Sequence, residues 1–285
     1  MRHPSPLRYP GGKAALTPFL AQTIKANGLP DCIYVEPFAG GAGAALSLLF
    51  SEEVSEIHLN DKDRRIYSLW KSILDEPEAF IGLLDRIPVS VGAWRRQRTI
   101  LRNHRSHSPL EVGFATFYLN RCNHSGVLNG GPIGGLRQDG DYRIDVRFNK
   151  AELRRRIEKI VLYRERIKIT NMDALVLMRR LGAKEHLLDR YLIYLDPPYF
   201  AKAERLYPLY YSEEDHKALA HYIARQKTLR WLISYDDAPT IRKLYQMKKI
   251  RLKKKYSLRS ARIGRELIIS SPTCILPNVN PLNLI

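Results

Sequence analysis

The residues best suited to chemistry are Asp196-Pro197-Pro198-Tyr199, which directly follow the apolar run Tyr191-Leu192-Ile193-Tyr194-Leu195. The apolar run predicts a buried strand, and α/β proteins bind their ligands where parallel strands end. The two prolines restrict φ and lack N–H groups, so the turn is stiff and its carbonyls remain free to accept hydrogen bonds. An acid, a carbonyl and an aromatic ring on one turn can hold a small planar amine.

The exocyclic amino group of a nucleobase is such an amine. The amino nitrogen of adenine or cytosine is a poor nucleophile because its lone pair is delocalised into the ring. Hydrogen bonds from this group to the Asp196 carboxylate and the Pro197 carbonyl would favour a pyramidal nitrogen with a localised lone pair. Tyr199 can stack on the base, which contributes roughly 1–3 kcal/mol, and the base must leave a duplex to enter the pocket. We predict that Asp196, Pro197, Pro198 and Tyr199 are catalytic, the alternative being a structural turn.

A glycine-rich turn and a second acid predict a cofactor site beside this motif. Ile33-Tyr34-Val35 is a predicted strand, followed by Glu36-Pro37-Phe38-Ala39-Gly40-Gly41-Ala42-Gly43 and a helix over residues 44–49. Glycines let a ligand approach the backbone, although this spacing is not GxGxxG and is weak alone. The next strand, over residues 56–61, ends in Asp61, which can accept the hydroxyls of a ribose. The alternative for Asp61 is a helix N-cap.

Two further polar residues have open alternatives. Lys13 follows Tyr9-Pro10-Gly11-Gly12, but the GxxxxGK[ST] pattern is absent, which argues against nucleotide hydrolysis. This segment can fold over a bound cofactor, or Lys13 can be a solvated lysine. Asp173 follows a predicted strand, where it can accept a hydrogen bond from the adenine of a cofactor or cap the next helix.

The elements around these motifs alternate between strand and helix patterns, which predicts an α/β fold. We expect helices over residues 150–164, 173–180, from the capping box Ser212-Glu213-Glu214-Asp215, and over 240–245, and strands over 167–170, 230–235, 250–256 and 266–270. The pattern changes between residues 76 and 149, where helices lead into a glycine-rich loop. We therefore predict a catalytic domain of residues 1–75 and 150–285 and an inserted, mainly helical domain of residues 76–149 with a hairpin at Asp139-Gly140.

The charge of the chain favours a polyanionic partner. Lysine and arginine number 47 against 29 acids, a net charge of +18, so nucleic acid is the first candidate and a merely basic surface the alternative. The insertion is rich in arginine, which reads guanine or holds phosphate. The predicted DNA contacts are Arg95, Arg121, Arg137, Gln138 and Arg143, with solvated charges as the alternative. The basic stretch of residues 248–255 either lines the DNA backbone or protects a sheet edge.

Other patterns narrow the class of protein. Cys32, Cys122 and Cys274 are odd in number and far apart without CxxC, which argues against a disulfide framework or a zinc site. The histidines have no metal-ligand spacing, so we expect no metal. The N-terminus lacks the apolar core of a signal peptide, and no apolar run could span a bilayer. We therefore expect a cytoplasmic, nucleoid-associated protein without a membrane partner.

The chain resembles the DNA adenine-N6 methyltransferases that use S-adenosylmethionine, the group that includes the bacterial Dam-type enzymes. The resemblance covers nearly the whole chain and rests on Tyr9-Pro10-Gly11-Gly12-Lys13, Glu36-Pro37-Phe38-Ala39-Gly40-Gly41, Asn60-Asp61, Phe117-Tyr118-Leu119-Asn120-Arg121 and Asp196-Pro197-Pro198-Tyr199. The order of these motifs is similar to the alpha arrangement. The resemblance implies a Rossmann-like class I methyltransferase sheet of seven strands with an antiparallel hairpin at one edge, an inserted DNA-recognition domain, and S-adenosylmethionine as cofactor. The resemblance implies cofactor contacts at Tyr9, Lys13, Asp61 and Asp196, and we also predict cofactor contacts at Glu36, Phe38, Gly40 and Asp173.

Together these patterns predict a site-specific DNA methyltransferase that transfers a methyl group from S-adenosylmethionine to N6 of a flipped adenine in duplex DNA. Three alternatives stay open: a cytosine-N4 DNA methyltransferase, an RNA adenine methyltransferase, and a DNA-binding regulator without catalysis. A monomer is favoured, and a cognate restriction endonuclease is a candidate partner. Because Cys122-Asn123-His124-Ser125-Gly126 differs from the run typical of the Dam group, the resemblance gives no recognition sequence.

Overall fold

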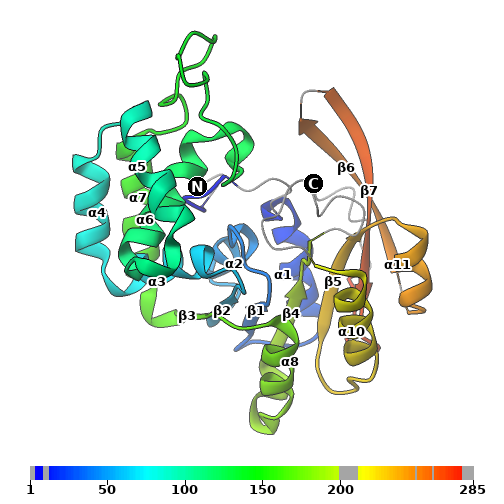
Figure 1. Cartoon of the computed structure of the whole chain (residues 1–285). Helices are drawn as coiled ribbons and strands as arrows, with labels where there is room; N and C mark the ends of the chain where they lie inside the picture. The colour runs from blue at the N-terminus through cyan, green and yellow to red at the C-terminus, as the bar shows by residue number, and fades with distance from the viewer. Residues whose placement is uncertain (1–3, 9–12, 199–210, 248, 259, 278–285) are drawn as a thin grey trace.

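The computed structural model describes residues 4–8, 13–198, 211–247, 249–258 and 260–277, the side chains of residues 249 and 251–265 excepted. One seven-stranded sheet with the order β3-β2-β1-β4-β5-β7-β6 runs through the molecule (Figure 1). Its strands are β1 (Ile33–Glu36), β2 (Glu56–Asn60), β3 (Ile167–Thr170), β4 (Tyr191–Leu195), β5 (Trp231–Asp236), β6 (Lys249–Leu258) and β7 (Ser260–Ser270).

The strand order creates a topological switch point between β1 and β4. Strands β1 to β5 are parallel to one another, while β7 is antiparallel to both β5 and β6. From β1 the chain moves outward to β2 and β3 and then returns to β4 on the other side of β1. Ligands of open α/β sheets bind at such a switch point, beyond the carboxyl ends of the strands. The predicted Rossmann-like methyltransferase sheet with an antiparallel hairpin at its edge is confirmed.

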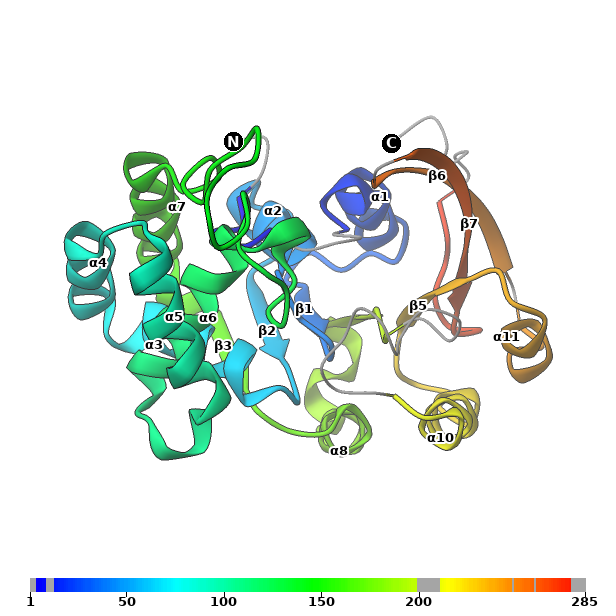
Figure 2. The same ribbon diagram turned by 45° about the horizontal axis from the view of Figure 1, so that its top comes forward.

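Helices cover both faces of the sheet, which explains why β4 is apolar throughout. Along β4, Tyr191, Ile193 and Leu195 pack in a cluster with α8 (Ala174–Gly182), α10 (Glu213–Ala224) and α11 (Pro239–Leu244). The alternate residues Leu192 and Tyr194 pack in the other cluster, with α1 (Thr17–Ala26) and α2 (Gly43–Phe50). Figure 2 shows these two groups of helices on opposite sides of the sheet. A parallel strand covered on both faces reads as a continuous apolar run.

The predicted insertion is mainly helical, but its helices share one hydrophobic cluster with the sheet. The helices beside β3 are α3 (Arg64–Asp75), α4 (Pro77–Arg86), α5 (Val91–Arg102), α6 (Pro109–Cys122) and α7 (Lys150–Leu162). Phe80 and Phe117 of α4 and α6 belong to the same cluster as Ile57 of β2. At Gly113 of α6, a Cβ atom would lie 2.5 Å from the Ser68 carbonyl oxygen, so α3 and α6 meet through a glycine.

The β-hairpin predicted at Asp139-Gly140 is wrong. Residues 127–148 form turns without strands, and one isolated bridge pairs Asn123 with Pro132. The Gln138 amide holds this loop together: its Nε2 donates to the carbonyls of Ile133 and Gly135 at 2.8 and 2.6 Å. Its Oε1 accepts a hydrogen bond from the backbone amide of Ile144 at 2.8 Å. Side-chain bonds to the backbone thus replace the strand ladder of a hairpin.

The basic C-terminal stretch forms an edge strand. β7 pairs with β5 only over residues 266–270 but with β6 along the whole of β6. Residues 253–258 and 260–265 therefore extend as a two-stranded ribbon beyond β5. The ribbon and the loop before α7 project to the same side of the molecule (Figure 1). The role predicted for the basic side chains of residues 248–255 lies outside the described side chains and stays a prediction.

Candidate active site

A cavity of about 600 Å³ lies at the carboxyl ends of β1, β2 and β4, within the range of about 300–1,000 Å³ typical of ligand pockets. The predicted site residues that line it are Lys13, Glu36, Phe38, Asp61, Arg121, Asp173, Asp196 and Pro198. Gly40 and Pro197 lie next to lining residues, and Tyr9 and Tyr199 lie outside the described residues. The fold thus brings the glycine turn, Asp61 and the Asp196 motif to one place.

Asp61 is half-buried at the end of β2, and it does not cap the following helix. Its carboxylate accepts hydrogen bonds from the amides of Gly40 and Asp63, at 3.0 and 2.9 Å. The N-cap of α3 is Asp63, which accepts from the amide of Arg65, so the capping alternative for Asp61 is wrong. Gly40 has a φ of 45°, in the left-handed region that favours glycine. Burial raises the pKa of Asp61 to about 7, and the charge of Asp63 adds to the effect.

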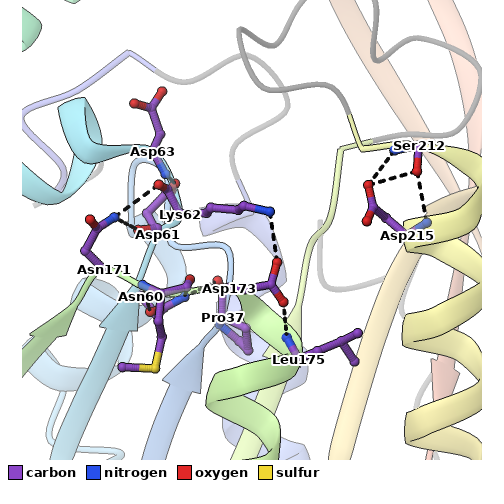
Figure 3. A network of polar contacts seen from close by, with 11 residues as sticks. Pro37, Asn60, Asp61, Lys62, Asp63, Asn171, Asp173, Leu175, Ser212 and Asp215 are labelled. Carbon is purple, nitrogen blue, oxygen red and sulfur yellow. Dashed lines mark hydrogen bonds and ion pairs between the residues drawn. The ribbon is translucent and has the colours of Figure 1, made fainter. Parts of the chain in front are cut away.

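Of the two roles left open for Asp173, the helix cap is confirmed, and contact with the adenine of a cofactor stays a prediction. Asp173 is the N-cap of α8, accepting from the amide of Leu175 at 2.9 Å, and it also lines the cavity. Lys62, which follows Asp61, pairs with the Asp173 carboxylate at 3.0 Å (Figure 3). The ends of β2 and β3 are thereby held together across the rim of the cavity.

Asn60 fixes the strand ends beneath these acids. Its Nδ2 donates to the carbonyls of Pro37 and Met172, at 2.9 and 3.0 Å. Its Oδ1 accepts from the hydroxyl of Thr170 at 2.9 Å. This fully buried amide therefore joins the ends of β1, β2 and β3. The only sequence signal for it is its place directly before Asp61 (Figure 3).

Asp196 is held by a buried lysine. The Lys13 Nζ lies 3.1 Å from Asp196 Oδ1 and 3.4 Å from Glu266 Oε1. Ser234 donates to the same Asp196 oxygen at 2.8 Å and accepts from the Tyr194 hydroxyl. With only 5% of its side chain exposed, Lys13 is not the solvated lysine of the alternative interpretation. Burial raises the pKa of Asp196, although the positive charge of Lys13 opposes this shift. Burial alone would lower the pKa of Lys13, but the charges of Asp196 and Glu266 outweigh it and the net shift is upward.

Glu36 adds a further buried acid to the cavity. It accepts hydrogen bonds from the Tyr34 hydroxyl at 3.1 Å and from the amide of Ala45 in α2 at 3.2 Å. Burial, together with the nearby Asp196 carboxylate, raises its pKa to about 8. Glu36 therefore carries a proton at neutral pH and joins β1 to the start of α2. Its contacts assign it a structural part in the cavity wall.

Two aromatic rings complete this part of the cavity. Phe38 and Tyr211 both line it and meet edge to face, with their ring centroids 5.6 Å apart. Tyr211 precedes the capping box of α10, in which the Ser212 side chain and Asp215 bond each other's amides (Figure 3). The predicted capping box is confirmed, and it lies directly after Tyr211, which lines the cavity.

Among the predicted DNA contacts, only Arg121 lines the cavity. Arg95 and Arg143 are exposed, and Arg137 pairs with Asp139 at 3.1 Å on the surface. The Gln138 amide is already bonded within its own loop. Three arginines outside these five predicted contacts also line the cavity: Arg8, Arg147 and Arg156. They are far apart in the chain and share no motif that would signal the grouping.

The described residues contain no group of three or more His, Cys, Asp or Glu side chains that could hold a metal ion. The three cysteines are buried free thiols. Within the described parts of the chain, no helix has both the length and the apolar character needed to cross a membrane.

The family model described as D12 class N6 adenine-specific DNA methyltransferase matches residues 9–258. No curated protein matches the chain. Among solved structures, the rRNA methyltransferase aviRa from Streptomyces viridochromogenes is similar in two structures, at 1.5 and 2.4 Å. The 1.5 Å structure has 12% sequence identity and a TM-score of 0.43, and the match covers 94% of this chain and 88% of that chain. The 2.4 Å structure has 13% identity and a TM-score of 0.38, with 90% and 85% covered.

Proposed function

Since the chain belongs to the D12 class of N6 adenine-specific DNA methyltransferases, we propose that it transfers the methyl group of S-adenosylmethionine to N6 of an adenine flipped out of duplex DNA. The observation that supports this proposal most strongly is the position of the Asp196 carboxylate, which is held on one side and exposed on the other. Its Oδ1 is fixed by Lys13 and Ser234, while 26% of its side chain remains exposed toward the cavity that it shares with Asp61. The carboxylate is oriented but open to a ligand.

The residues present fit the cofactor. Asp61 uses part of its carboxylate to bind two amides and retains lone pairs that can accept the hydroxyls of a ribose. Asp173 and Phe38 are further lining groups that can contact the adenine of the cofactor. When bound there, S-adenosylmethionine would supply an activated methyl group on a sulfonium. The acids Asp61, Asp173 and Asp196 in the cavity suit the positive charge of that sulfonium.

The chain's own groups then act on the adenine amine. Asp196 and the Pro197 carbonyl accept the two hydrogens of the amino group and draw its lone pair out of the ring. Lys13 and Ser234 keep Asp196 Oδ1 in place, so the carboxylate does not rotate when the base enters. The raised pKa of Asp196 makes it a better acceptor of the proton that the amine loses. Alignment of the reacting atoms supplies the rest of the acceleration.

Nucleoside analysis tests this proposal directly. The purified protein is incubated with genomic DNA and S-adenosylmethionine, and the digested nucleosides are measured by mass spectrometry. We expect N6-methyladenine, and an Asp196→Asn variant should form it about 100- to 10,000-fold more slowly while it still binds DNA, because a neutral amide is a weaker acceptor of the amine hydrogens than a carboxylate. N4-methylcytosine as the product, methylation of RNA alone, or full activity of the variant would contradict the proposal.

A further inference from the structure

Four arginines from separate segments line one cavity with Asp61 and Asp196: Arg8, Arg121, Arg147 and Arg156, hereafter the arginine wall. Arg8 belongs to the N-terminal segment, Arg121 to the last turn of α6, Arg147 to the loop before α7, and Arg156 to α7. The same cavity thus has acidic groups at the strand ends and guanidinium groups from the helical region.

Backbone carbonyls, which carry no net charge, hold most of the arginine wall in place. Arg121 Nε donates to the carbonyl of Arg147 at 2.7 Å, and Arg8 donates to the carbonyl of Asn123 at 3.3 Å. Arg156 donates to the carbonyl of Ser5 at 2.9 Å. Such bonds orient the guanidinium groups but leave their positive charge uncompensated.

Carboxylates are scarce around the arginine wall. Glu152 pairs with Arg156, and it is the only acid that forms an ion pair with the wall in the described part of the chain. By contrast, the exposed Arg154 on the same helix pairs with both Asp85 and Glu158. The like charges also repel each other: burial, then Arg156 and Arg8, lower the pKa of Arg121 to about 10. Burial and Arg147 lower the pKa of Arg8 in the same way. The fold therefore maintains a positive site that an anion would stabilise.

We propose that the arginine wall binds the phosphodiester groups that flank the flipped adenine, an inference that rests on the proposed function. A base held at Asp196 brings its own backbone phosphates into the same cavity, because the two are covalently joined. Guanidinium groups bind phosphate oxygens through paired, charge-assisted hydrogen bonds. Arg147 is exposed whereas Arg121 is half-buried, so the wall extends from the interior to solvent. The backbone of a flipped nucleotide would also run from the interior of the cavity to solvent, where the strand rejoins its duplex.

The carboxylate of the cofactor is the other anion that could reach these residues, and the experiment separates the two. Arg147→Gln and Arg121→Gln are compared with Arg225→Gln, which removes an equal charge from an exposed residue at the end of α10. DNA affinity is measured by fluorescence anisotropy at several salt concentrations, and S-adenosylhomocysteine affinity by calorimetry. We expect both wall variants to bind DNA about tenfold more weakly, because each removes one charge-assisted hydrogen-bond donor. The salt slope should fall by about 0.9 for each phosphate that the variant no longer neutralises, with affinity for S-adenosylhomocysteine unchanged.

Neutral phosphate analogues provide the decisive arm. Duplexes are made that contain the sequence methylated by the protein, with the target adenine still unmethylated. Each duplex has a methylphosphonate in place of one of the phosphates beside that adenine. At one of these positions, the substitution should weaken binding by the wild-type protein but cause no further loss of affinity in Arg147→Gln or Arg121→Gln. Fully additive losses at every position would overturn the inference, as would weaker S-adenosylhomocysteine binding with DNA affinity unchanged. Exposed Arg147 keeps the test valid if Arg121→Gln fails to fold. Failure of the proposed function would be distinct, since the wild-type protein would then form no N6-methyladenine.

Discussion

Burial decides the chemical state of Asp61. The carboxylate lies where β2 ends, and its removal from water raises its pKa to about 7 despite two backbone amides that favour the charged form. Between pH 3.8 and about 7, the folded protein holds a proton on Asp61 that the unfolded chain has already released. The contribution of Asp61 to the free energy of unfolding therefore falls as pH rises through this range. A ligand that donates hydroxyl hydrogens to Asp61 would favour the ionised form.

This state predicts a pH dependence of cofactor binding. Below about pH 7 Asp61 is mostly protonated and accepts hydroxyl hydrogens poorly, so affinity for S-adenosylhomocysteine should rise as pH increases through that value. An Asp61→Asn variant should bind about tenfold more weakly above it, which corresponds to the removal of one charge-assisted bond, and should show no such pH dependence. Calorimetry at a series of pH values measures both effects. The exposed Asp85→Asn serves as control, and a variant that retains the wild-type profile would refute the placement of the ribose.

The residues that position Asp196 show how far the sequence can lead. The motif of residues 196–199 and Lys13 could be predicted from types and order, but Glu266 could not. Lys13 and Glu266 are 253 positions apart, and only the antiparallel pairing of β7 on β5 brings the acid to the lysine. The one sequence signal for Glu266 is an acid directly before an apolar strand segment. The sequence signal for the role of Ser234 beside Asp196 is equally weak, since it is only a polar residue within the apolar strand β5.

At the scale of elements, hydrophobic period and strand ends predicted nearly all of the sheet. The continuous apolar run of β4 and the acids that follow β2 and β4 indicated the ligand edge, because a parallel sheet places all its ligand groups at one edge. The antiparallel hairpin at the sheet edge was implied by the family resemblance. The glycine-rich loop was predicted, but its conformation over residues 127–148 was not. Its form depends on bonds from the Gln138 side chain to the backbone, and these compete locally with strand pairing.

The contact between α3 and α6 gives a prediction about stability. Replacing Gly113 by alanine would place a methyl group within 2.5 Å of the Ser68 carbonyl oxygen, which forces the two helices apart. We expect the free energy of unfolding to fall by about 1–3 kcal/mol, the usual cost of overpacking. The matched control is Gly131→Ala, where nothing lies within 4 Å of the added atom and stability should change little. Thermal denaturation followed by circular dichroism measures both, and equal melting temperatures would show that the helices yield without cost.

Over the whole molecule, charge is unevenly divided. The chain has a net charge of +18, yet the acids Asp61, Asp173 and Asp196 lie together at the strand ends in the cavity. Excess positive charge would attract DNA over a long range through solvent, where salt screens it strongly. In the proposed function, the cavity acids instead contact a small ligand at short range. Two binding events with different physical origins should therefore respond differently to salt.

The salt dependence of the two ligands tests this division. If the protein neutralises about 6–10 phosphates, its affinity for DNA should fall about 10³- to 10⁵-fold as salt rises from about 50 to 200 mM. The affinity for S-adenosylhomocysteine should change little over the same range, because close contacts inside a cavity are screened far less than exposed charges. Anisotropy and calorimetry on one protein preparation provide the two curves. If the affinity for S-adenosylhomocysteine fell as steeply as the affinity for DNA, both ligands would depend on the same exposed charge. That result would contradict the proposal that the strand-end acids hold the methyl donor inside the cavity.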